Sequence, residues 1–173
     1  MYNAKYKFSS THVDVPKALS GEIKEWGIKI PDNDIFTVPG EPFYGREDEI
    51  HTTVLYGIHE RRPEKIASVI RNFGEVSVAL NDIGIFSNPK YDVIFVKCTS
   101  DDLDRLRKLL IGNFDYTDSY KRYEPHITIA YVKKDMGWKY YGNHTFAKRS
   151  FTINKIVFSS VSGEKYEILL RNE

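Results

Sequence analysis

Two histidines and two threonines occur in the same short pattern at two places in the chain. Residues 51–56 read His-Thr-Thr-Val-Leu-Tyr and residues 126–131 read His-Ile-Thr-Ile-Ala-Tyr, so both follow His-x-Thr-apolar-x-Tyr at a separation of 75 residues. Both segments are rich in β-branched and aromatic residues, which predicts strands. Side chains alternate between the two faces of a strand, so each histidine shares a face with its threonine, about 6.6 Å further along. If the two strands lie close together, two imidazoles and two hydroxyls face one site.

This set of groups suits cleavage of a phosphodiester. Such a reaction needs a base for the proton of the attacking oxygen and an acid for the leaving oxygen, and histidine can serve as either near neutral pH. Threonine hydroxyls can donate to the non-bridging phosphate oxygens. We therefore predict a catalytic set of His51, Thr53, His126 and Thr128, with no cofactor and no metal, since the five histidines show no metal-site spacing.

The duplication is what favours catalysis over a structural role. One His-x-Thr on a strand is weak evidence, because a lone histidine is more often structural or exposed. Two copies, in matching strand contexts and with the same apolar residue and tyrosine in register, are hard to attribute to composition alone. Two alternatives stay open: a module that binds a nucleotide without turning it over, and a structural protein that retains the repeat only as a scaffold.

Length and composition bound the remaining possibilities. A chain of 173 residues with 41% hydrophobic and 28% charged residues predicts a single folded domain over 1–173. A net charge of +1 argues against an extended duplex-binding surface, while a small anionic ligand needs only a local positive patch. Cys98 is the single cysteine, and there is no run of about 18 apolar residues, so we expect no membrane association and a cytoplasmic location.

The strand and helix patterns must position the two motifs. Amphipathic helices are predicted over 16–27, after Pro63 as far as Gly74, and over 101–111. Strands are predicted over 5–15, 50–57, 76–80 with 84–87, 93–98, 126–132, 151–159 and 165–170, with a hairpin at Gly163. In the motif strands, Tyr56 and Tyr131 are expected to face the core, opposite the histidines. A long loop covers 31–49, and the fold class is α+β with mainly antiparallel sheets.

At these motifs the chain resembles the two-histidine phosphoesterase superfamily, which includes 2′-5′ RNA ligase-like proteins and 2′,3′-cyclic nucleotide phosphodiesterases. The resemblance extends from about residue 5 to residue 170, and Pro125 before the second motif is typical of the family. Ile50 departs from the proline common before the first motif. The resemblance implies two pseudo-symmetric lobes, each an antiparallel sheet with outer helices, around a central cleft. It also implies that the histidines form the acid–base pair and the threonines hold the phosphate.

A finer resemblance concerns the class of substrate. The runs Ser9-Ser-Thr-His12 and Gly45 through Gly57 are similar to a phage-associated branch of nucleases that cleave cyclic oligonucleotides and disarm bacterial signalling immunity, the anti-CBASS class. That resemblance implies a cyclic oligonucleotide as substrate, and action in the host cytoplasm if the protein is phage-encoded. RNA ends that carry a 2′,3′-cyclic phosphate remain an equal alternative.

Three further residues are predicted to bind the substrate. Arg46, five residues before His51, is a candidate for a charge-assisted contact with phosphate. Tyr123 and Trp138 flank the second motif strand and are candidates for stacking on a base. His12 shares a strand face with Asp14, where we expect a structural or cleft-edge histidine.

Overall fold

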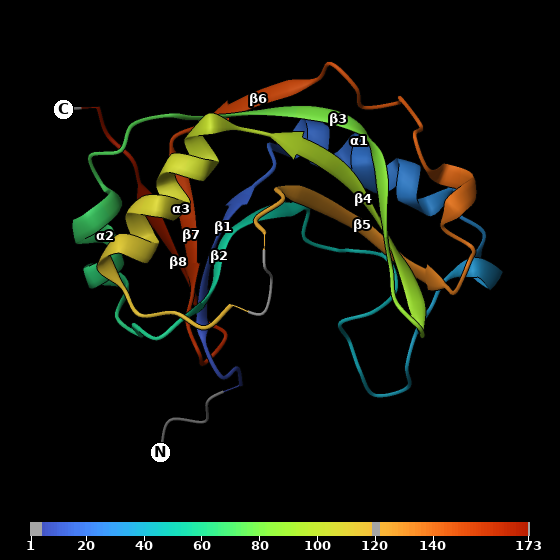
Figure 1. Ribbon diagram of the computed structural model, residues 1–173, viewed down its shortest axis with the longest axis horizontal. Helices are drawn as coiled ribbons and strands as arrows, with labels where there is room; N and C mark the ends of the chain where they lie inside the picture. The colour runs from blue at the N-terminus through green and yellow to red at the C-terminus, as the bar shows by residue number, and fades with distance from the viewer. Residues whose placement is uncertain (1–4, 119–121, 173) are drawn as a thin grey trace.

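One eight-stranded sheet forms the centre of the molecule. The computed structural model describes residues 5–118 and 122–172. The strand order is β6-β3-β4-β5-β2-β1-β7-β8, and every neighbouring pair within the described residues is antiparallel (Figure 1). The strands are β1 (Ser9–Asp14), β2 (His51–Ile58), β3 (Val76–Ser87), β4 (Tyr91–Thr99), β5 (His126–Lys133), β6 (Ser150–Ile153), β7 (Lys155–Ser159) and β8 (Lys165–Leu169).

The three predicted helices are present, which confirms the α+β fold class. They are α1 (Lys17–Ile28), α2 (Pro63–Ile70) and α3 (Asp101–Asn113), with short 3₁₀ turns η1 (Asp32–Asp34) and η2 (Trp138–Tyr140). The Ser100 hydroxyl accepts from the Leu103 amide and so caps α3, while Pro63 occupies the first turn of α2. Helices α2 and α3 pack on each other, α3 lies against β2 and β3, and α1 lies against β5. None of the helices in the described part of the chain is long and apolar enough to span a membrane.

The two motif strands meet at the middle of the sheet. Within the described residues, strands β2 and β5 are joined through a single register pair, Thr52 opposite Ile127. On one side of this seam lie β2, β1, β7 and β8, which we call the β1 half; on the other lie β5, β4, β3 and β6, the β4 half. The two halves are therefore four strands each, with one His-x-Thr motif on the innermost strand of each.

Each motif strand carries a β-bulge directly after its threonine. In β2, Val54 is the extra residue, because His12 pairs with Thr53 while Thr11 pairs with Leu55. In β5, Ile129 is the extra residue, because Phe95 pairs with Thr128 while Ile94 pairs with Ala130. After an inserted residue, the side chains of the rest of the strand point to the opposite faces of the sheet from those that a strict alternation predicts.

These bulges overturn one expectation from the sequence. Tyr56 and Tyr131 were expected to face the core, but Tyr56 is 47% exposed and Tyr131 is half-buried among Tyr44 and Tyr91. A strict two-residue period does not allow for the inserted residue. The Thr11 hydroxyl supports the β2 bulge, because it accepts a hydrogen bond from the Leu55 amide at 3.2 Å and donates one to the Leu55 carbonyl oxygen at 3.4 Å.

Two strand boundaries also differ from the predicted ones. The segment 76–87 is one continuous strand, β3, rather than two. The segment 151–159 is divided at Asn154 into β6, on the outer edge of the β4 half, and β7, inside the β1 half. The predicted hairpin at Gly163 is confirmed, because β7 and β8 pair from Lys155–Leu169 to Ser159–Lys165.

Gly57 provides a test of the β2 geometry. Its φ is +85°, and a Cβ there would lie 1.8 Å from the Thr117 carbonyl oxygen. We expect Gly57→Ala to lower the free energy of unfolding by at least about 2 kcal/mol, through a strained φ and a backbone clash. The measurement is urea-induced unfolding followed by circular dichroism.

The matched control is Gly21→Ala in α1. A Cβ at Gly21 meets no described atom within 4 Å, so alanine there should raise stability by roughly 0.5–1 kcal/mol through its higher helix propensity. An equal and small effect of both substitutions would contradict the positive φ of Gly57 and its close approach to Thr117.

Candidate active site

The sheet register brings the two His-x-Thr motifs onto one face. Thr52 and Ile127 lie opposite each other and are buried on the core side, so the residues on either side of them point the other way. Continuing the antiparallel register places His51 opposite Thr128 and Thr53 opposite His126. All four side chains are half-buried. Diagonal neighbours of this kind lie roughly 7–8 Å apart, which leaves room for a phosphate group between the imidazoles.

The imidazole rings of His51 and His126 are held in the same way. The Nδ1 atom of His51 lies 2.6 Å from the Glu49 carbonyl oxygen, and that of His126 lies 2.8 Å from the Glu124 carbonyl oxygen. A carbonyl oxygen only accepts hydrogen bonds, so each Nδ1 carries the proton and donates it. The Nε2 atom of each ring is then available to take or give a proton. The same contact two residues upstream in both motifs was not predicted from the sequence.

The surroundings of His126 favour its neutral form. Burial lowers the pKa of His126, and the nearby His51 lowers it further, against the hydrogen bond to the Glu124 carbonyl. The burial comes from two phenylalanine rings, Phe86 and Phe95, whose centroids lie 5.0 and 5.3 Å from that of His126.

A third imidazole adjoins His51. The rings of His12 and His51 have centroids 4.9 Å apart, and His12 lies opposite Thr53 in the register of β1 and β2. His12 is 7% exposed, and its Nε2 atom lies 3.1 Å from the Asp14 carboxylate. Burial, followed by the nearby His51, lowers the pKa of His12 to about 4. His12 is therefore a buried histidine that lies between Asp14 and the ring of His51.

An aromatic and basic margin extends from His126 across the β4 half. Phe86 and Phe95 stack with centroids 4.0 Å apart, and Lys97, opposite His126 in the register, places its Nζ 5.0 Å from the centre of the Tyr141 ring. Gly84 makes this possible, because a Cβ there would lie 2.6 Å from the tip of Phe95 and 2.8 Å from Lys97 Cε. The sequence offered one signal for this margin, namely the two-residue spacing of Phe95 and Lys97 within a predicted strand.

Trp138 lies beside this margin. It lies in η2, is 51% exposed, and its ring centroid lies 5.8 Å from that of Tyr141, which is 57% exposed. Trp138 and Tyr141 thus present adjacent exposed rings beside Lys97. A role in binding a base remains a proposal.

Arg46 is engaged elsewhere. Its guanidinium donates to the Gly27 and Ile30 carbonyl oxygens at the end of α1 and to the Asp32 carboxylate at 2.8 Å. These contacts fasten the last turn of α1 to the 31–49 loop. The structure directs the Arg46 charge to the end of α1 and not to the two motifs.

Tyr123 supports the seam instead of offering a ring to a ligand. Its hydroxyl donates to the Thr53 carbonyl oxygen at 2.8 Å, and the Arg107 guanidinium carbon lies 4.9 Å from its ring centre. Burial raises the pKa of Tyr123 well above its ordinary value, so the hydroxyl remains a donor. The sequence placed Tyr123 near the second motif, but its contact is with the backbone of the first.

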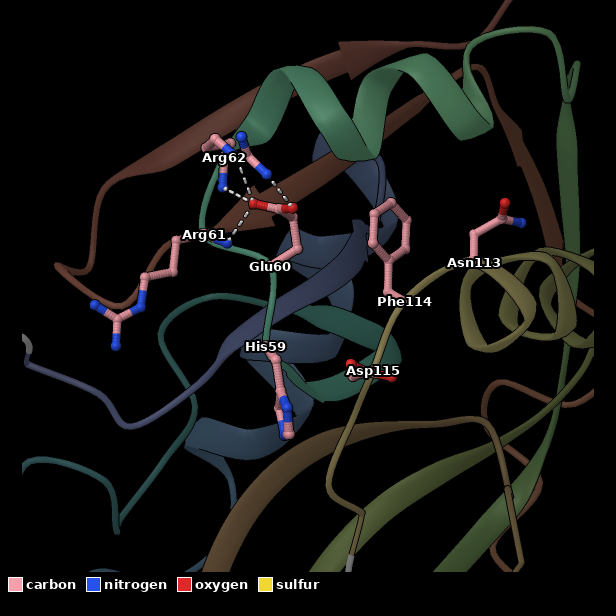
Figure 2. A pocket seen from close by; sticks show the side chains of 7 residues that line it. All are labelled: His59, Glu60, Arg61, Arg62, Asn113, Phe114 and Asp115. Atoms are coloured by element: carbon pink, nitrogen blue, oxygen red, sulfur yellow. Dashed lines mark hydrogen bonds and ion pairs between the residues drawn. The ribbon is translucent and has the colours of Figure 1, made fainter.

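One hollow lies away from the motifs. It has a volume of about 610 Å³ and is formed by residues 59–62 and 113–115 (Figure 2). The Glu60 carboxylate within it already accepts from the Arg61 and Arg62 amides and from the Arg62 guanidinium. The side chains of Glu60 and Arg62 are therefore paired with each other in this hollow. Among the described residues, no group of three histidine, cysteine or acidic side chains is arranged to hold a metal ion.

Solved structures with the same fold span nearly the whole chain. TT0787 of Thermus thermophilus has a TM-score of 0.65 and 16% identity, covering 96% of this chain and 99% of its own. The E. coli LigT complexes with 3′-AMP and with NADP⁺ have TM-scores of 0.57 and 0.53 and identities of 17% and 18%; each match covers 95% of both chains. No curated protein sequence matches the chain.

The family follows from the sequence match. The model of the 2′-5′ RNA ligase superfamily matches residues 16–161, a span that contains both His-x-Thr motifs, both β-bulges and all three helices. The antiparallel α+β fold agrees with this match. The chain belongs to the 2′-5′ RNA ligase superfamily, the two-histidine phosphoesterases.

Proposed function

We propose that the protein is a metal-independent phosphodiesterase that cleaves a nucleotide phosphodiester between His51 and His126. The observation that carries this proposal is the pairing of the two motif strands, with each Nδ1 fixed by a carbonyl oxygen two residues upstream. One imidazole takes the proton of the attacking oxygen, and the other gives a proton to the leaving oxygen. Membership of the phosphoesterase superfamily supports the same chemistry.

The threonines act across the seam. Continuing the register of Thr52 and Ile127 pairs His51 with Thr128 and Thr53 with His126, so each imidazole is expected to have a hydroxyl from the other motif beside it. Hydroxyls at these positions donate to the non-bridging oxygens, whose negative charge grows as the fifth oxygen approaches phosphorus. Fixed donors require little reorganisation during the reaction, which is the source of their catalytic effect.

The substrate class that we propose is a cyclic oligonucleotide or an RNA end with a 2′,3′-cyclic phosphate. Exposed rings at Trp138 and Tyr141 offer surfaces for a base, and Lys97 supplies a positive charge beside them. The similarity to LigT, whose structures hold 3′-AMP, NADP⁺ or ATP, is consistent with a nucleotide ligand. Such substrates are found in the cytoplasm, where we propose that the protein acts, in a bacterial host if it is phage-encoded.

The first prediction concerns the four motif residues. With 2′,3′-cyclic nucleotides, cyclic dinucleotides and cyclic trinucleotides as substrates and EDTA present, His51→Ala and His126→Ala should each lower kcat by about 10²- to 10⁴-fold. Thr53→Val and Thr128→Val should each lower kcat by roughly 10²- to 10³-fold, as for other transition-state donors. Product formation is followed by mass spectrometry.

Thr52→Val is the matched control, since Thr52 lies between the two motif residues on the opposite face. Its hydroxyl is fully buried and finds no hydrogen-bond partner among the described residues, so valine should preserve activity and stability. Full activity in either histidine variant, or loss of activity in EDTA, would overturn the mechanism. Tight binding with the nucleotide recovered intact would instead favour a binding module.

The second prediction concerns the aromatic margin. Trp138→Leu and Tyr141→Leu should each raise KM by roughly tenfold, with a smaller effect on kcat, because a stacked base contributes about 1–3 kcal/mol. Tyr166→Leu is the control, because Tyr166 is a partly exposed tyrosine on β8, in the β1 half. Steady-state kinetics with the nucleotide that is turned over measures both constants. Unchanged KM values would contradict the proposal that a nucleobase stacks on Trp138 or Tyr141.

A further inference from the structure

The tyrosines that end the two repeats have different surroundings. After the β-bulges, both return to the open face of the sheet. Tyr131 is covered there, because the ring centroids of Tyr44 and Tyr91 lie 5.4 and 5.5 Å from its own. Tyr56 is 47% exposed, and Phe8 meets it edge-on with ring centroids 6.4 Å apart. The repeat therefore places an open tyrosine beside the first motif and a covered one beside the second.

Phe8 joins Tyr56 to a third ring, that of His59. Phe8 and His59 stack with centroids 5.1 Å apart and planes 13° apart, and His59 is exposed. The backbone explains this grouping. Gly57, with a φ of +85°, is skipped in the register of β1 and β2, so Ile58 is buried while the residues on either side of this pair are exposed. Phe8, Tyr56 and His59 therefore form one cluster at the surface, which we call the β2 cluster.

The β2 cluster leads from the first motif to the hollow. His59 is a member of the cluster and also lines the hollow, together with residues 60–62 and 113–115 (Figure 2). At about 3.3 Å per residue, the chain covers at most about 20 Å between Thr53 and His59. The Thr117 hydroxyl lies 2.8 Å from His59 Nε2 and fixes the ring at this junction. The cluster and the hollow thus form a continuous surface that starts beside the first motif.

Two cations on this surface have no ionic partner among the described residues. Arg61 is exposed, and its guanidinium points away from the paired Glu60 (Figure 2). Lys7 is exposed, and its Nζ lies 5.2 Å from the centre of the Phe8 ring. Asp115 contributes a carboxylate to the hollow. The surface therefore has a small positive excess, which is enough to attract a few phosphates but not the many of a duplex.

Aromatic rings that lie beside cations are typical of surfaces that bind single-stranded nucleic acid. Bases stack on the rings and the cations contact the phosphates, with little dependence on base sequence. The hollow lies at the end of β2 away from His51, so a ligand that reaches it from the motifs must be a chain of several nucleotides. A mononucleotide ends at the motifs, and the ring of a cyclic dinucleotide closes near them. The geometry therefore favours a linear strand.

We propose that the β2 cluster and the hollow form a second binding site, which holds a linear single-stranded RNA beyond the phosphate that reacts between His51 and His126. The inference rests on the proposed function and selects, within its substrate class, an RNA strand with a 2′,3′-cyclic phosphate end. The exposed ring of Tyr56 stacks on a base, and Arg61 and Lys7 bind phosphates further along the strand. Such a surface lowers KM for longer substrates without taking part in the cleavage.

Substrate length is the first test. The unaltered protein is assayed with adenosine 2′,3′-cyclic phosphate, with a dinucleotide and a tetranucleotide of adenosine that end in the same cyclic phosphate, and with a cyclic dinucleotide. We expect KM to fall by at least about tenfold from the mononucleotide to the tetranucleotide, since one stacked base accounts for a change of that size. The value of kcat should change much less, because the reacting groups are the same in all three linear substrates.

Tyr56→Leu and Arg61→Gln locate the second site. Tyr56→Leu should raise KM for the tetranucleotide by roughly tenfold and KM for the mononucleotide far less, because only the longer strand places a base on this ring. Arg61→Gln should reduce the slope of log KM against log salt by about 0.7 on the tetranucleotide, as for one lost phosphate contact with a single strand. Both side chains are exposed, and circular dichroism checks that each variant is folded.

Two controls match these substitutions. Tyr166→Leu removes a partly exposed tyrosine from β8, and Lys24→Gln removes an exposed cation from α1, which packs against β5. Neither residue belongs to the β2 cluster or lines the hollow. Both substitutions should leave KM and its salt dependence unchanged on all the linear substrates.

The outcomes separate the two proposals. Failure of the unaltered protein to cleave any of the substrates overturns the proposed function. Cleavage of the mononucleotide and the tetranucleotide with the same KM overturns the second site alone, as does a lower KM for the cyclic dinucleotide than for the tetranucleotide. A dependence on length that survives in both Tyr56→Leu and Arg61→Gln overturns the location of the second site in the β2 cluster and the hollow.

Discussion

The pairing of β2 with β5 is the contact on which the candidate site depends. Thr52 and Ile127 meet across the centre of the sheet and point into the core, so their neighbours in both strands point outward together. A shift of one residue in this register would move every motif side chain to the buried face. Burial of the intervening residues therefore fixes the orientation of the reactive ones. The Tyr123 hydroxyl adds a bond to the Thr53 carbonyl at the same seam.

The paired bulges have a second effect on the site. By inserting Val54 and Ile129 directly after the motif threonines, they place two consecutive core residues in each strand and return Tyr56 and Tyr131 to the open face. The outward-facing part of each motif is thus limited to one histidine and one threonine before the pattern changes phase. That both strands share this irregularity shows that the repeat extends to backbone geometry as well as residue type.

Most of the fold, and the central residues of the site, could be predicted from local patterns in the sequence. The three helices are visible from their apolar spacing, and the two motifs from their repetition. The β-bulges leave no such mark, because an inserted residue is defined only by the partner strand. The division of 151–159 at Asn154 was missed for the same reason, since nothing local distinguishes one long strand from two short ones in different halves.

The positions of single side chains were harder to foresee than the elements that carry them. Arg46 has the charge expected of a ligand contact, but its guanidinium binds a carbonyl oxygen at the end of α1. Tyr123 has the ring expected of one, but its hydroxyl donates to the Thr53 carbonyl oxygen, 70 residues away in the sequence. Lys97 and Phe86 were missed because their nearness to His126 depends on three strands and on the missing side chain of Gly84.

The route of the chain means that the β4 half of the sheet is one continuous segment, from β3 to β6, inserted between the strands of the β1 half. The β1 half takes its strands from both ends of the chain, and the β4 half receives its edge strand after the second motif, immediately before the chain returns through β7 (Figure 1). Helix α1 follows β1 but packs against β5. The β1 half can therefore assemble only after the chain has returned through β7 and β8, and a single cut releases neither half as an intact fragment.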